Sequence, residues 1–572
     1  MRQVLSGLTA ARGLALGQAR IRESHVLTTE DQPLAPAQVE PEVERLLQAI
    51  AATRAELSDL REQLHGALAQ EIGEFLDLHA MMLDDPDLVE GLTGLIRAGR
   101  YTASHALKLQ HDRLVAVFEA MDDPYLRSRR EDIDHVLGRV QSALYRDPKG
   151  NEVIGLAGDV LISDSVAPAE LAQMSERGVV ALLIAQGSVL SHSAIMARSL
   201  GLPMLILPPE SLASIPEGAA VMVDAVRSAV IVEPDPNDLL ELRQREFAQA
   251  RERRALARLR GRPSTTRDGA QIRLLANAES REDITQAQRL GVAGIGLYRT
   301  ELLFLQHREP PGEEQQLAAY RDAILGMDGR PVTLRIFDLG ADKADHAGIS
   351  LPNEPNPALG LRGVRLALAR PALLRTQLRA MLRASSYGPV RILIPMVTRR
   401  DELILVRKQL RACARQLRQE GHHPAGSIEL GAMIEVPAAA VALPAMLSAL
   451  DFVSIGTNDL IQYLLAADRG NEALGGLFSP LYPAVIRVLH QVIRTCQASG
   501  TPVSVCGEIA SDTRYTRLLL ALGLRDFSMH PASLLEVRAV IRDSELRRLR
   551  RQAAPLLRAG RRASLERLVA AL

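Results

Sequence analysis

The stretch LGAMIEVPAAAVALPAMLSALDFVSIGTND, residues 430–459, consists of two short apolar runs on either side of a helical segment. The first run ends at Glu435, and the second ends at Asn458 and Asp459. Short apolar runs bounded by polar or turn residues are typical of buried strands, and the residues between these two have the length of a helix. The stretch therefore predicts a strand–helix–strand unit that carries polar side chains at the carboxyl ends of its strands.

The same pattern repeats through residues 263–572. Eight apolar runs alternate there with helical segments, and the runs are QIRLLAN (271–277), GIGLYRTE (294–301), VTLRIFDLG (332–340), VRILIPM (390–396), LGAMIEVP (430–437), FVSIGTND (452–459), PVSVCGE (502–508) and DFSMH (526–530). Strands and helices that alternate at this count predict a (β/α)8 TIM barrel.

Side chains capable of chemistry follow six of these eight runs. They are Asn277, Arg299, Glu301, Arg335, Asp338, Glu435, Asn458, Asp459, Cys506 and Glu508. Ordinary caps and salt bridges at strand ends explain one or two such residues, but not the whole set. Because active sites of TIM barrels form at the carboxyl ends of the strands, the sequence predicts that one face of the barrel carries the chemistry.

Four arginines of this region suit a small anionic ligand. Arg299 and Arg335 end neighbouring runs, and Arg362 and Arg469 follow in the segments LGLRGVR and AADRGNE. A guanidinium offers paired donors in one plane, which matches the oxygens of carboxylate and phosphate groups. We therefore expect a small polyanion as the substrate.

Two carboxylates and one thiol complete the candidate chemistry of this face. Glu435 and Asp459 follow successive runs, and carboxylate oxygens are ligands that Mg²⁺ or Mn²⁺ prefers. Most free cysteines are small buried core residues, and Cys413 and Cys496 lie in helical segments that fit this description. Cys506 instead follows a strand among charged residues, where a thiol can deliver or remove a proton.

The first 262 residues show a different organisation. Apolar residues recur at helical spacing from about residue 37 to 147, and short β-branched runs such as GDVLI and AAVMVDA flank that region. We expect residues 1–30 and 148–232 to form one α/β domain, with residues 31–147 inserted as a helical bundle. Residues 233–262 are highly charged and predict a helical linker, or a solvated helix without a mechanical role.

His192 lies in the stretch GSVLSHSAIMARSLGLPMLIL, residues 187–207. Ser191 or Ser193 is a good N-cap, and Gly201 is a typical stop, so we expect a helix of one to two turns between them. The amino end of a helix favours a phosphoryl group, and neutral imidazole is nucleophilic. Most of the 13 histidines of a chain like this have surface or core roles, but this context makes His192 a candidate nucleophile.

Composition excludes several classes of protein. The 572 residues predict two to four domains, and the equal totals of 68 basic and 68 acidic residues argue against a general nucleic-acid or membrane-surface role. Three cysteines without paired spacing indicate a reducing compartment, so we expect a cytoplasmic protein. No stretch approaches twenty uninterrupted apolar residues, which argues against secretion and membrane insertion.

The chain resembles the Enzyme I family of the phosphotransferase system, the phosphoenolpyruvate–protein phosphotransferases. The resemblance rests on five segments in the family's order, SHSAIMARSLGLP, GIGLYRTELLFL, GAMIEVPAAA, VSIGTNDLIQYLLAADRGNE and CGEIASD. It extends from the opening LSGLTAARGLALG to near the C-terminus. It implies a swivelling phosphohistidine α/β domain with an inserted helical bundle, a helical linker and a C-terminal TIM barrel.

The resemblance also implies an activity. In the family, phosphoenolpyruvate (PEP) binds at the barrel mouth with Mg²⁺, a histidine takes its phosphoryl group, and the group passes to a histidine of the carrier HPr docked on the helical insertion. The matching positions are His192 as nucleophile, Cys506 as the acid that protonates the enolate, Glu435 and Asp459 as metal ligands, and Arg299, Arg335, Arg362, Asn458, Asp459 and Arg469 around the substrate. The family is homodimeric through its barrel.

Several residues depart from the family pattern. Before Ser191 the family usually has a glycine pair, a basic residue and threonine, where this chain has Gly187, Ser188, Val189 and Leu190. Leu190 cannot donate a hydrogen bond to a phosphoryl group, so transfer could be slower, carrier choice could change, or Ser191, Ser193 and Arg198 could compensate. Ile336 replaces a common threonine, and His530 replaces a smaller residue.

Three other functions stay open at this point. A pyruvate–phosphate dikinase or PEP synthase needs a nucleotide-binding domain, for which the chain has neither room nor a convincing glycine-rich loop. A nitrogen-type regulatory Enzyme I would use the same residues, but without a sensory domain before Leu5 we expect the sugar system instead. A degenerate homologue that binds PEP without turnover would have lost residues such as His192 and Cys506, which this chain retains.

Overall fold

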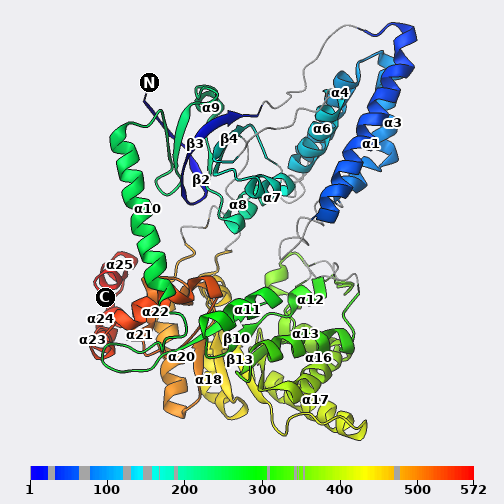
Figure 1. Cartoon of the computed structure of the whole chain (residues 1–572). Helices are drawn as coiled ribbons and strands as arrows, with labels where there is room; N and C mark the ends of the chain where they lie inside the picture. Colours follow the sequence, from blue (N-terminus) through cyan, green and yellow to red (C-terminus); the bar gives the residue numbers. More distant parts are fainter. Residues whose placement is uncertain are drawn as a thin grey trace. The chain divides into compact units, whose positions relative to one another are not determined.

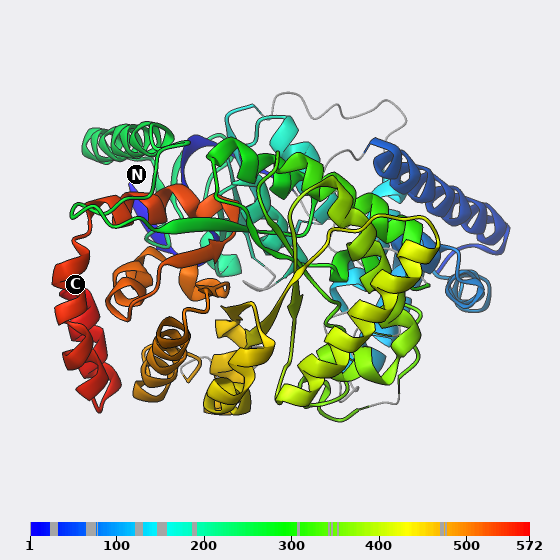
Figure 2. The same cartoon turned by 90° about the horizontal axis from the view of Figure 1, so that it is seen from below.

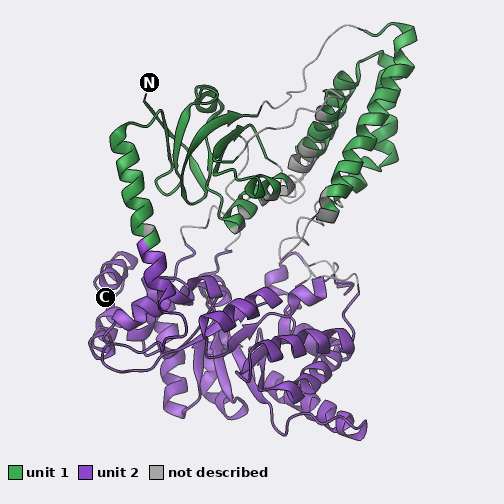
Figure 3. Ribbon diagram, in the orientation of Figure 1, with its two compact units in different colours: residues 1–250 green, residues 251–572 purple. Residues whose placement is uncertain are grey.

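A computed structural model describes most of the chain in two compact units, residues 1–250 and 251–572 (Figure 3). The described residues are 2–22, 33–63, 76, 78–119, 130–145, 157–166, 168–185, 191–305, 309–340, 344, 347–351, 354–468, 474 and 477–572. Among them, no helix is both long and apolar enough to cross a membrane.

The first unit is built on one mixed eight-stranded sheet, visible in the upper part of Figure 1. Its strands are β1 (Gln3–Ser6), β2 (Leu8–Ala11), β3 (Leu14–Ile21), β4 (Asp159–Ser163), β5 (Ala181–Ile184), β6 (Met204–Ile206), β7 (Ala220–Asp224) and β8 (Ala229–Val232), in the order β1-β8-β7-β3-β4-β5-β6-β2. Strand β3 pairs with β4 in parallel and with β7 in antiparallel register, so the first 21 residues share a sheet with strands after residue 158.

Four long helices lie between β3 and β4 in the chain. They are α1 (Val39–Gln63), α3 (Pro86–Gly99), α4 (Ala103–Glu119) and α6 (Arg130–Tyr145). Helix α6 packs against both α1 and α4, and their apolar faces share one core that includes Leu46, Leu107 and Leu137. The helical spacing of apolar residues in this region therefore corresponds to buried faces of helices.

Four further helices belong to or extend from this sheet. They are α7 (Pro168–Glu176), α8 (His192–Leu200), α9 (Pro209–Ala213) and α10 (Pro236–Ala257). Helix α10 has few buried residues because its sequence is highly charged, and the boundary between the two units falls within it.

The second unit contains a closed barrel of eight parallel strands, which confirms the predicted TIM barrel. The strands are β9 (Arg273–Ala278), β10 (Ile295–Tyr298), β11 (Val332–Arg335), β12 (Val390–Ile394), β13 (Glu429–Ile434), β14 (Phe452–Ile455), β15 (Val503–Val505) and β16 (Asp526–Met529). Each overlaps one of the eight apolar runs, and β16 closes the barrel on β9. The mixed α/β fold class is thus also confirmed.

Helices surround the barrel strands, as Figure 2 shows. They are α11 (Arg281–Leu290), α12 (Glu301–Leu305), α13 (Glu313–Gly326), α15 (Gly363–Ala369), α16 (Pro371–Ala384), α17 (Arg400–Gln419), α18 (Pro437–Met446), α19 (Thr457–Leu465), α20 (Pro483–Ser499), α21 (Thr513–Ala521), α22 (Leu534–Asp543), α23 (Leu546–Arg551), α24 (Ala553–Arg558) and α25 (Arg562–Ala570). Aliphatic side chains between strands and helices form one continuous core.

A buried arginine fixes the segment that follows α10 to the barrel unit. Arg538 of α22 is 1% exposed, and its Nη1 donates to the carbonyls of Leu259 at 2.7 Å and Leu290 at 3.0 Å. Arg542 of the same helix donates to the Pro263 carbonyl at 2.8 Å. These bonds satisfy the carbonyl of the last residue of α11 and two carbonyls that follow α10, so residues 259–263 are held by the barrel.

Candidate active site

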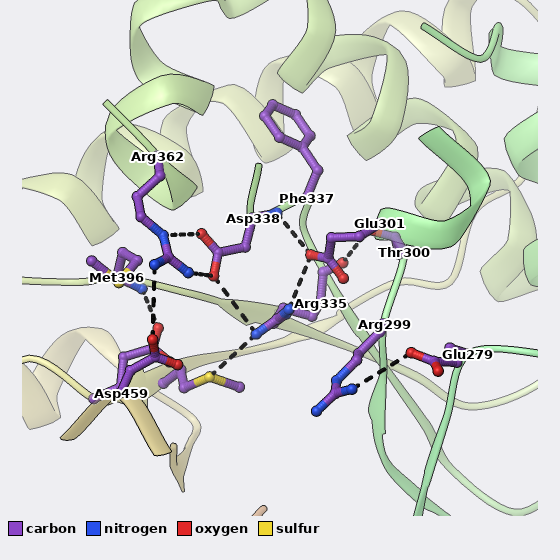
Figure 4. A network of polar contacts seen from close by, with 12 residues as sticks. Glu279, Arg299, Thr300, Glu301, Arg335, Phe337, Asp338, Arg362, Met396 and Asp459 are labelled. Carbon is purple, nitrogen blue, oxygen red and sulfur yellow. Dashed lines mark hydrogen bonds and ion pairs between the residues drawn. The ribbon is translucent and has the colours of Figure 1, made fainter. Parts of the chain in front are cut away.

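Charged side chains from four barrel segments meet at the carboxyl ends of β10 and β11 (Figure 4). Arg335 Nη2 lies 3.0 Å from Glu301 Oε1, which also accepts the backbone N–H of Asp338 at 2.7 Å. Arg335 Nη1 lies 3.8 Å from Asp338 Oδ2. Arg335 and Asp338, at the carboxyl end of β11, are therefore linked through the carboxylate of Glu301.

Arg362 extends this network toward β14. Its Nε and Nη2 donate to the two oxygens of Asp338 at 3.0 and 2.8 Å, which is the paired geometry of a strong guanidinium–carboxylate bond. Its Nη1 lies 3.8 Å from Asp459 Oδ1 and donates to the Tyr463 hydroxyl at 3.3 Å. The structure thus brings together Arg335, Arg362 and Asp459, three of the residues that the sequence singles out.

Both arginines of this network stay charged. Burial acts to lower the pKa of Arg335, but the charges of Glu301, Asp338 and Glu435 outweigh it and raise that pKa above its usual value. Burial opposes the charge of Arg362 in the same way, and its contact with Asp338 raises its pKa. Two permanent cations are therefore held in place by carboxylates, with guanidinium groups that match the oxygens of an anion.

Glu435 is the most deeply buried acid of the site. Its side chain is fully buried, and its Oε1 accepts the backbone N–H of Met396 at 2.6 Å. Its Oε2 has no hydrogen-bond partner among the described residues. Burial, together with the charges of Asp459 and Asp338, raises the pKa of Glu435 to about 8. A buried carboxylate oxygen without a donor is costly, and a bound cation would relieve that cost.

The balance of charge in this network also favours a bound cation. Four carboxylates, Glu301, Asp338, Glu435 and Asp459, face the two guanidinium groups of Arg335 and Arg362. When all are ionised, two negative charges are not balanced within the network. A divalent cation supplies the missing charge, and oxygen ligands suit Mg²⁺ or Mn²⁺. Glu435 and Asp459 therefore fit such an ion, although no cluster of three metal-ligand side chains occurs among the described residues.

Backbone geometry brings Met396 to Glu435. Met396 has a φ of 56°, a left-handed conformation that non-glycine residues seldom adopt. Gly363 lies against it with a φ of 55°, and a Cβ atom at that glycine would come within 2.7 Å of the Met396 Cβ. Glycine directly after Arg362 is therefore required for this loop to approach. The sequence did not single out Met396, because its contribution is a backbone N–H.

A second group of predicted residues lines a neighbouring pocket of about 230 Å³. Its walls include Asn277, Arg299, Asn458, Cys506, Glu508 and His530. Arg299 lies 3.5 Å from Glu279 at the rim and is half-exposed, so its guanidinium is available to a ligand. The pocket is large enough for a three-carbon acid with a phosphate group.

Asn458 and Glu508 hold two strand-end loops together across this pocket. Asn458 Nδ2 donates to Glu508 Oε1, and the Glu508 backbone N–H donates to Asn458 Oδ1, both at 3.0 Å. Asn458 was predicted to bind the substrate, and in this structure its amide is engaged with Glu508. Asn277, which is not among the predicted binding residues, donates to the Cys506 carbonyl at 2.9 Å and fixes the loop that carries the thiol.

The Cys506 thiol is buried at the pocket wall and lies 3.5 Å from the Ile455 carbonyl. Burial raises the pKa of Cys506 to about 11, while the nearby charges of Arg335 and Arg299 act in the opposite direction. The thiol is therefore protonated at neutral pH, so it can act as a proton donor but is a poor nucleophile there.

The two barrel positions that depart from the family pattern have different surroundings. Ile336 is fully buried in the aliphatic core, where its side chain adds no polar group to the pocket. His530 lies at the pocket rim with its Nε2 3.5 Å from Asp283, and this carboxylate raises the pKa of His530. Neither change removes a charged group from the site.

His192 is the first residue of α8 in the other unit. The helix begins as predicted, because Ser191 Oγ accepts the N–H of Ala194 at 3.2 Å, and it ends at Gly201 with a φ of 66°. Its nine residues make about 2.5 turns, longer than the one to two turns expected. His192 therefore lies at the amino end of α8, where the helix dipole favours a negative charge.

Two of the residues that could compensate for the missing polar residues before Ser191 have hydrogen-bond partners elsewhere in the domain. Arg198 lies in the last turn of α8 and donates to the Ala10 carbonyl at 2.8 Å, at the opposite end of the helix from His192. Ser193 is buried, and its hydroxyl donates to the Val166 carbonyl at 2.6 Å. Gly187 to Leu190 and the predicted substrate residue Arg469 lie outside the described residues.

Comparison with known proteins identifies the class. Models of the PEP-utilising enzymes match three successive parts of the chain, namely the N-terminal domain at residues 6–129, the mobile domain at 155–228 and the PEP-binding domain at 253–546. The chain is therefore a PEP-utilising enzyme.

Individual relatives narrow the class to one family. A phosphoenolpyruvate-protein phosphotransferase of Cupriavidus necator is 42% identical over 562 residues and covers 95% of each chain. One of Haemophilus influenzae is 34% identical over 545 residues and covers 94% of each. A solution structure of an Enzyme I protein covers 43% of this chain and 99% of its own, with 26% identity and a TM-score of 0.36. The chain belongs to the phosphoenolpyruvate-protein phosphotransferase family and is a phosphotransferase.

Proposed function

We propose that this enzyme transfers the phosphoryl group of PEP to its own His192, releases pyruvate, and passes the group to a histidine of the carrier HPr. This would be the first step of sugar uptake by the phosphotransferase system, in the cytoplasm. The observation that carries the proposal is the buried network in which Arg335 and Arg362 meet four carboxylates beside the Cys506 pocket.

The arginines act on the substrate by charge and by geometry. Arg335 and Arg362 are held by carboxylates in fixed orientations, and Arg299 lies at the rim with its guanidinium half-exposed. PEP carries a carboxylate and a phosphate, whose oxygens match guanidinium donors. Asn458, Asp459 and Arg469 complete the proposed substrate contacts. Donors oriented in advance stabilise the charge of the group in transfer without reorganisation during the reaction.

Glu435 and Asp459 are the proposed ligands of Mg²⁺, with Mn²⁺ as an alternative. The ion would neutralise phosphate and enolate oxygens while the phosphoryl group is transferred. Before the ion binds, Glu435 must give up the proton that its raised pKa retains near neutral pH. The Glu435 oxygen that finds no hydrogen-bond partner within the described part of the chain supports Glu435 as the inner ligand.

Glu435→Gln is expected to weaken the apparent affinity for Mg²⁺ at least about tenfold, because an amide cannot replace the charge of a ligand. Titrating Mg²⁺ against the initial rate of pyruvate release measures this effect. Glu429→Gln is the matched control, since Glu429 is exposed at the other end of the same strand. An unchanged Mg²⁺ dependence in Glu435→Gln would contradict the assignment.

Cys506 is the proposed acid that protonates the enolate after the phosphoryl group leaves. We expect Cys506→Ala to slow pyruvate release at least about 10²-fold, the usual contribution of a positioned acid, and to leave PEP binding intact by calorimetry. Because the acid form is required and burial raises the pKa of Cys506 to about 11, pyruvate release should fall only as the pH approaches 11, well above the rise expected near pH 8 as Glu435 loses its proton. Cys496→Ala controls for loss of a buried thiol, and lost PEP binding in Cys506→Ala would contradict the role.

His192 would serve two partners in turn, because it lies in a different unit from the PEP site. This requires the α/β domain of residues 1–30 and 148–232 to swivel, and we place the linker at residues 233–262. The hydrogen bonds of Arg538 and Arg542 support that placement, since they hold residues 259–263 to the barrel unit. The helical insertion, residues 31–147, is the proposed docking site of HPr, and residues 263–572 are the proposed dimer contact.

Phosphoryl relay to a carrier tests the proposal. Purified protein with labelled PEP, Mg²⁺ and HPr should yield labelled HPr and an equal amount of pyruvate. Transfer to a nitrogen-type carrier but not to HPr would assign the enzyme to the regulatory branch instead. PEP binding without any labelled protein would indicate a degenerate homologue. Sedimentation with and without PEP tests the homodimer.

A further inference from the structure

A buried hydrogen-bond network lies behind the anion site, between the ends of β10 and β11 and helices α13 and α16. Its central residue is Gln377 of α16, which is fully buried. The Gln377 carbonyl oxygen accepts the backbone N–H of Phe337 at 3.0 Å. Its amide nitrogen donates to the hydroxyl groups of Thr300 and Tyr320, each at 3.1 Å.

The donors and acceptors of this network have only one consistent direction. Thr300 accepts from Gln377 and donates its own hydroxyl hydrogen to the Arg335 carbonyl at 3.0 Å. Tyr320 accepts from Gln377 and donates to Gln316 Oε1 at 3.0 Å, and Gln316 donates to the Pro311 carbonyl at 2.8 Å. Each polar group therefore specifies the orientation of the next, and a residue of similar size without both functions cannot replace Gln377.

The network forms hydrogen bonds with the backbone at the point where the pairing of β11 with β12 ends. Pairing of β11 with β12 ends at Ile336, whose N–H donates to the Leu393 carbonyl at 3.1 Å. Gln377 then supplies the partner of the Phe337 N–H and, through Thr300, that of the Arg335 carbonyl. Two backbone groups on either side of Ile336 are thus fixed from one side chain.

These two backbone groups set the positions of the charged side chains that project from the same segment. The first group is the carbonyl of Arg335 itself. The second is the N–H of Phe337, the residue directly before Asp338. Asp338 in turn orients Arg362 through two hydrogen bonds. A shift of this segment by a fraction of a hydrogen-bond length would therefore move both guanidinium groups. Such groups need placement within about 0.5 Å to act on a transferring phosphoryl group.

We infer that Gln377 is a positioning residue for PEP binding and phosphoryl transfer, acting through the backbone on Arg335 and on the Asp338–Arg362 pair. The inference rests on the proposed role of Arg335 and Arg362 in holding PEP. Gln377 itself is separated from the ligand by the β11 segment that it supports.

Gln377→Leu tests the inference in the full-length protein. We expect the Kd for PEP, measured by calorimetry with Mg²⁺, to rise at least tenfold. Leu378→Ala is the matched control, because Leu378 is fully buried next to Gln377 on the same helix but has no part in the network. It should lower the melting temperature at least as much as Gln377→Leu and change the Kd less than twofold. If Gln377→Leu and Leu378→Ala changed the Kd for PEP equally, Gln377 would contribute only to stability, and the inference would be overturned.

Two further measurements keep the test decisive. Thr300→Val has nearly the same shape and breaks only the connection from Gln377 to the Arg335 carbonyl, so it should also weaken PEP binding even if Gln377→Leu does not fold. In an Arg335→Lys background, Gln377→Leu should add a smaller loss than it causes in the wild-type protein, since part of its effect acts through Arg335. Wild-type protein that neither binds PEP nor becomes labelled would refute the proposed function. Normal wild-type activity with unaltered binding in Gln377→Leu and Thr300→Val would refute only this inference.

Discussion

Arg335→Leu is expected to slow transfer of the phosphoryl group from PEP by about 10³-fold, which is the upper range for removal of one charged donor from a preorganised site. Arg335 is the deepest cation of the network, and its charge is fixed by Glu301 and Asp338. Leucine fills much of the volume but leaves those carboxylates facing the incoming phosphate. The substrate would then meet repulsion where the wild-type enzyme offers attraction.

Stability must be separated from catalysis in this variant. Removing one partner of a buried ion pair costs about 3–5 kcal/mol, because the remaining charge stays buried. Thermal unfolding should accordingly show a lower melting temperature, and rates are compared only at temperatures where the variant is folded. Arg335→Lys keeps the charge without the paired donors and should fall between wild type and Arg335→Leu.

Rapid-quench measurement of labelled protein from labelled PEP gives the rate directly. Arg415→Leu is the matched control, since Arg415 is exposed on α17 of the same unit. It should transfer at the wild-type rate. A folded Arg335→Leu variant that retains more than a tenth of the wild-type rate would remove Arg335 from the proposed site.

The barrel and the face that carries its chemistry could be predicted from sequence because both depend on local patterns. Each strand is buried on both sides and reads as a short apolar run, and polar side chains directly follow six of the runs. Glu435 and Asp459 come from neighbouring strands for this reason. The predicted N-cap Ser191 and stop Gly201 of α8 follow from equally local rules.

The interior of the site could not be predicted in this way, because it depends on contacts between distant segments. Met396 contributes a backbone N–H in a left-handed conformation, which its side chain does not reveal. Gln377 lies on a helix 40 residues from the N–H that it accepts, and as one polar residue among others it gives no local signal. Arg198 is close to His192 in sequence, but it lies in the last turn of α8 and donates to the Ala10 carbonyl, 188 residues away.

The most direct test of the account is the chemical position of the phosphoryl group. Protein incubated with labelled PEP and Mg²⁺ is digested at alkaline pH, where phosphohistidine survives, and the labelled peptide is sequenced by mass spectrometry. The account predicts one acid-labile label on His192, no label in His192→Ala, and wild-type labelling in His423→Ala, which alters an exposed histidine of the other unit. Label on any other residue, or label that persists in His192→Ala, would contradict it.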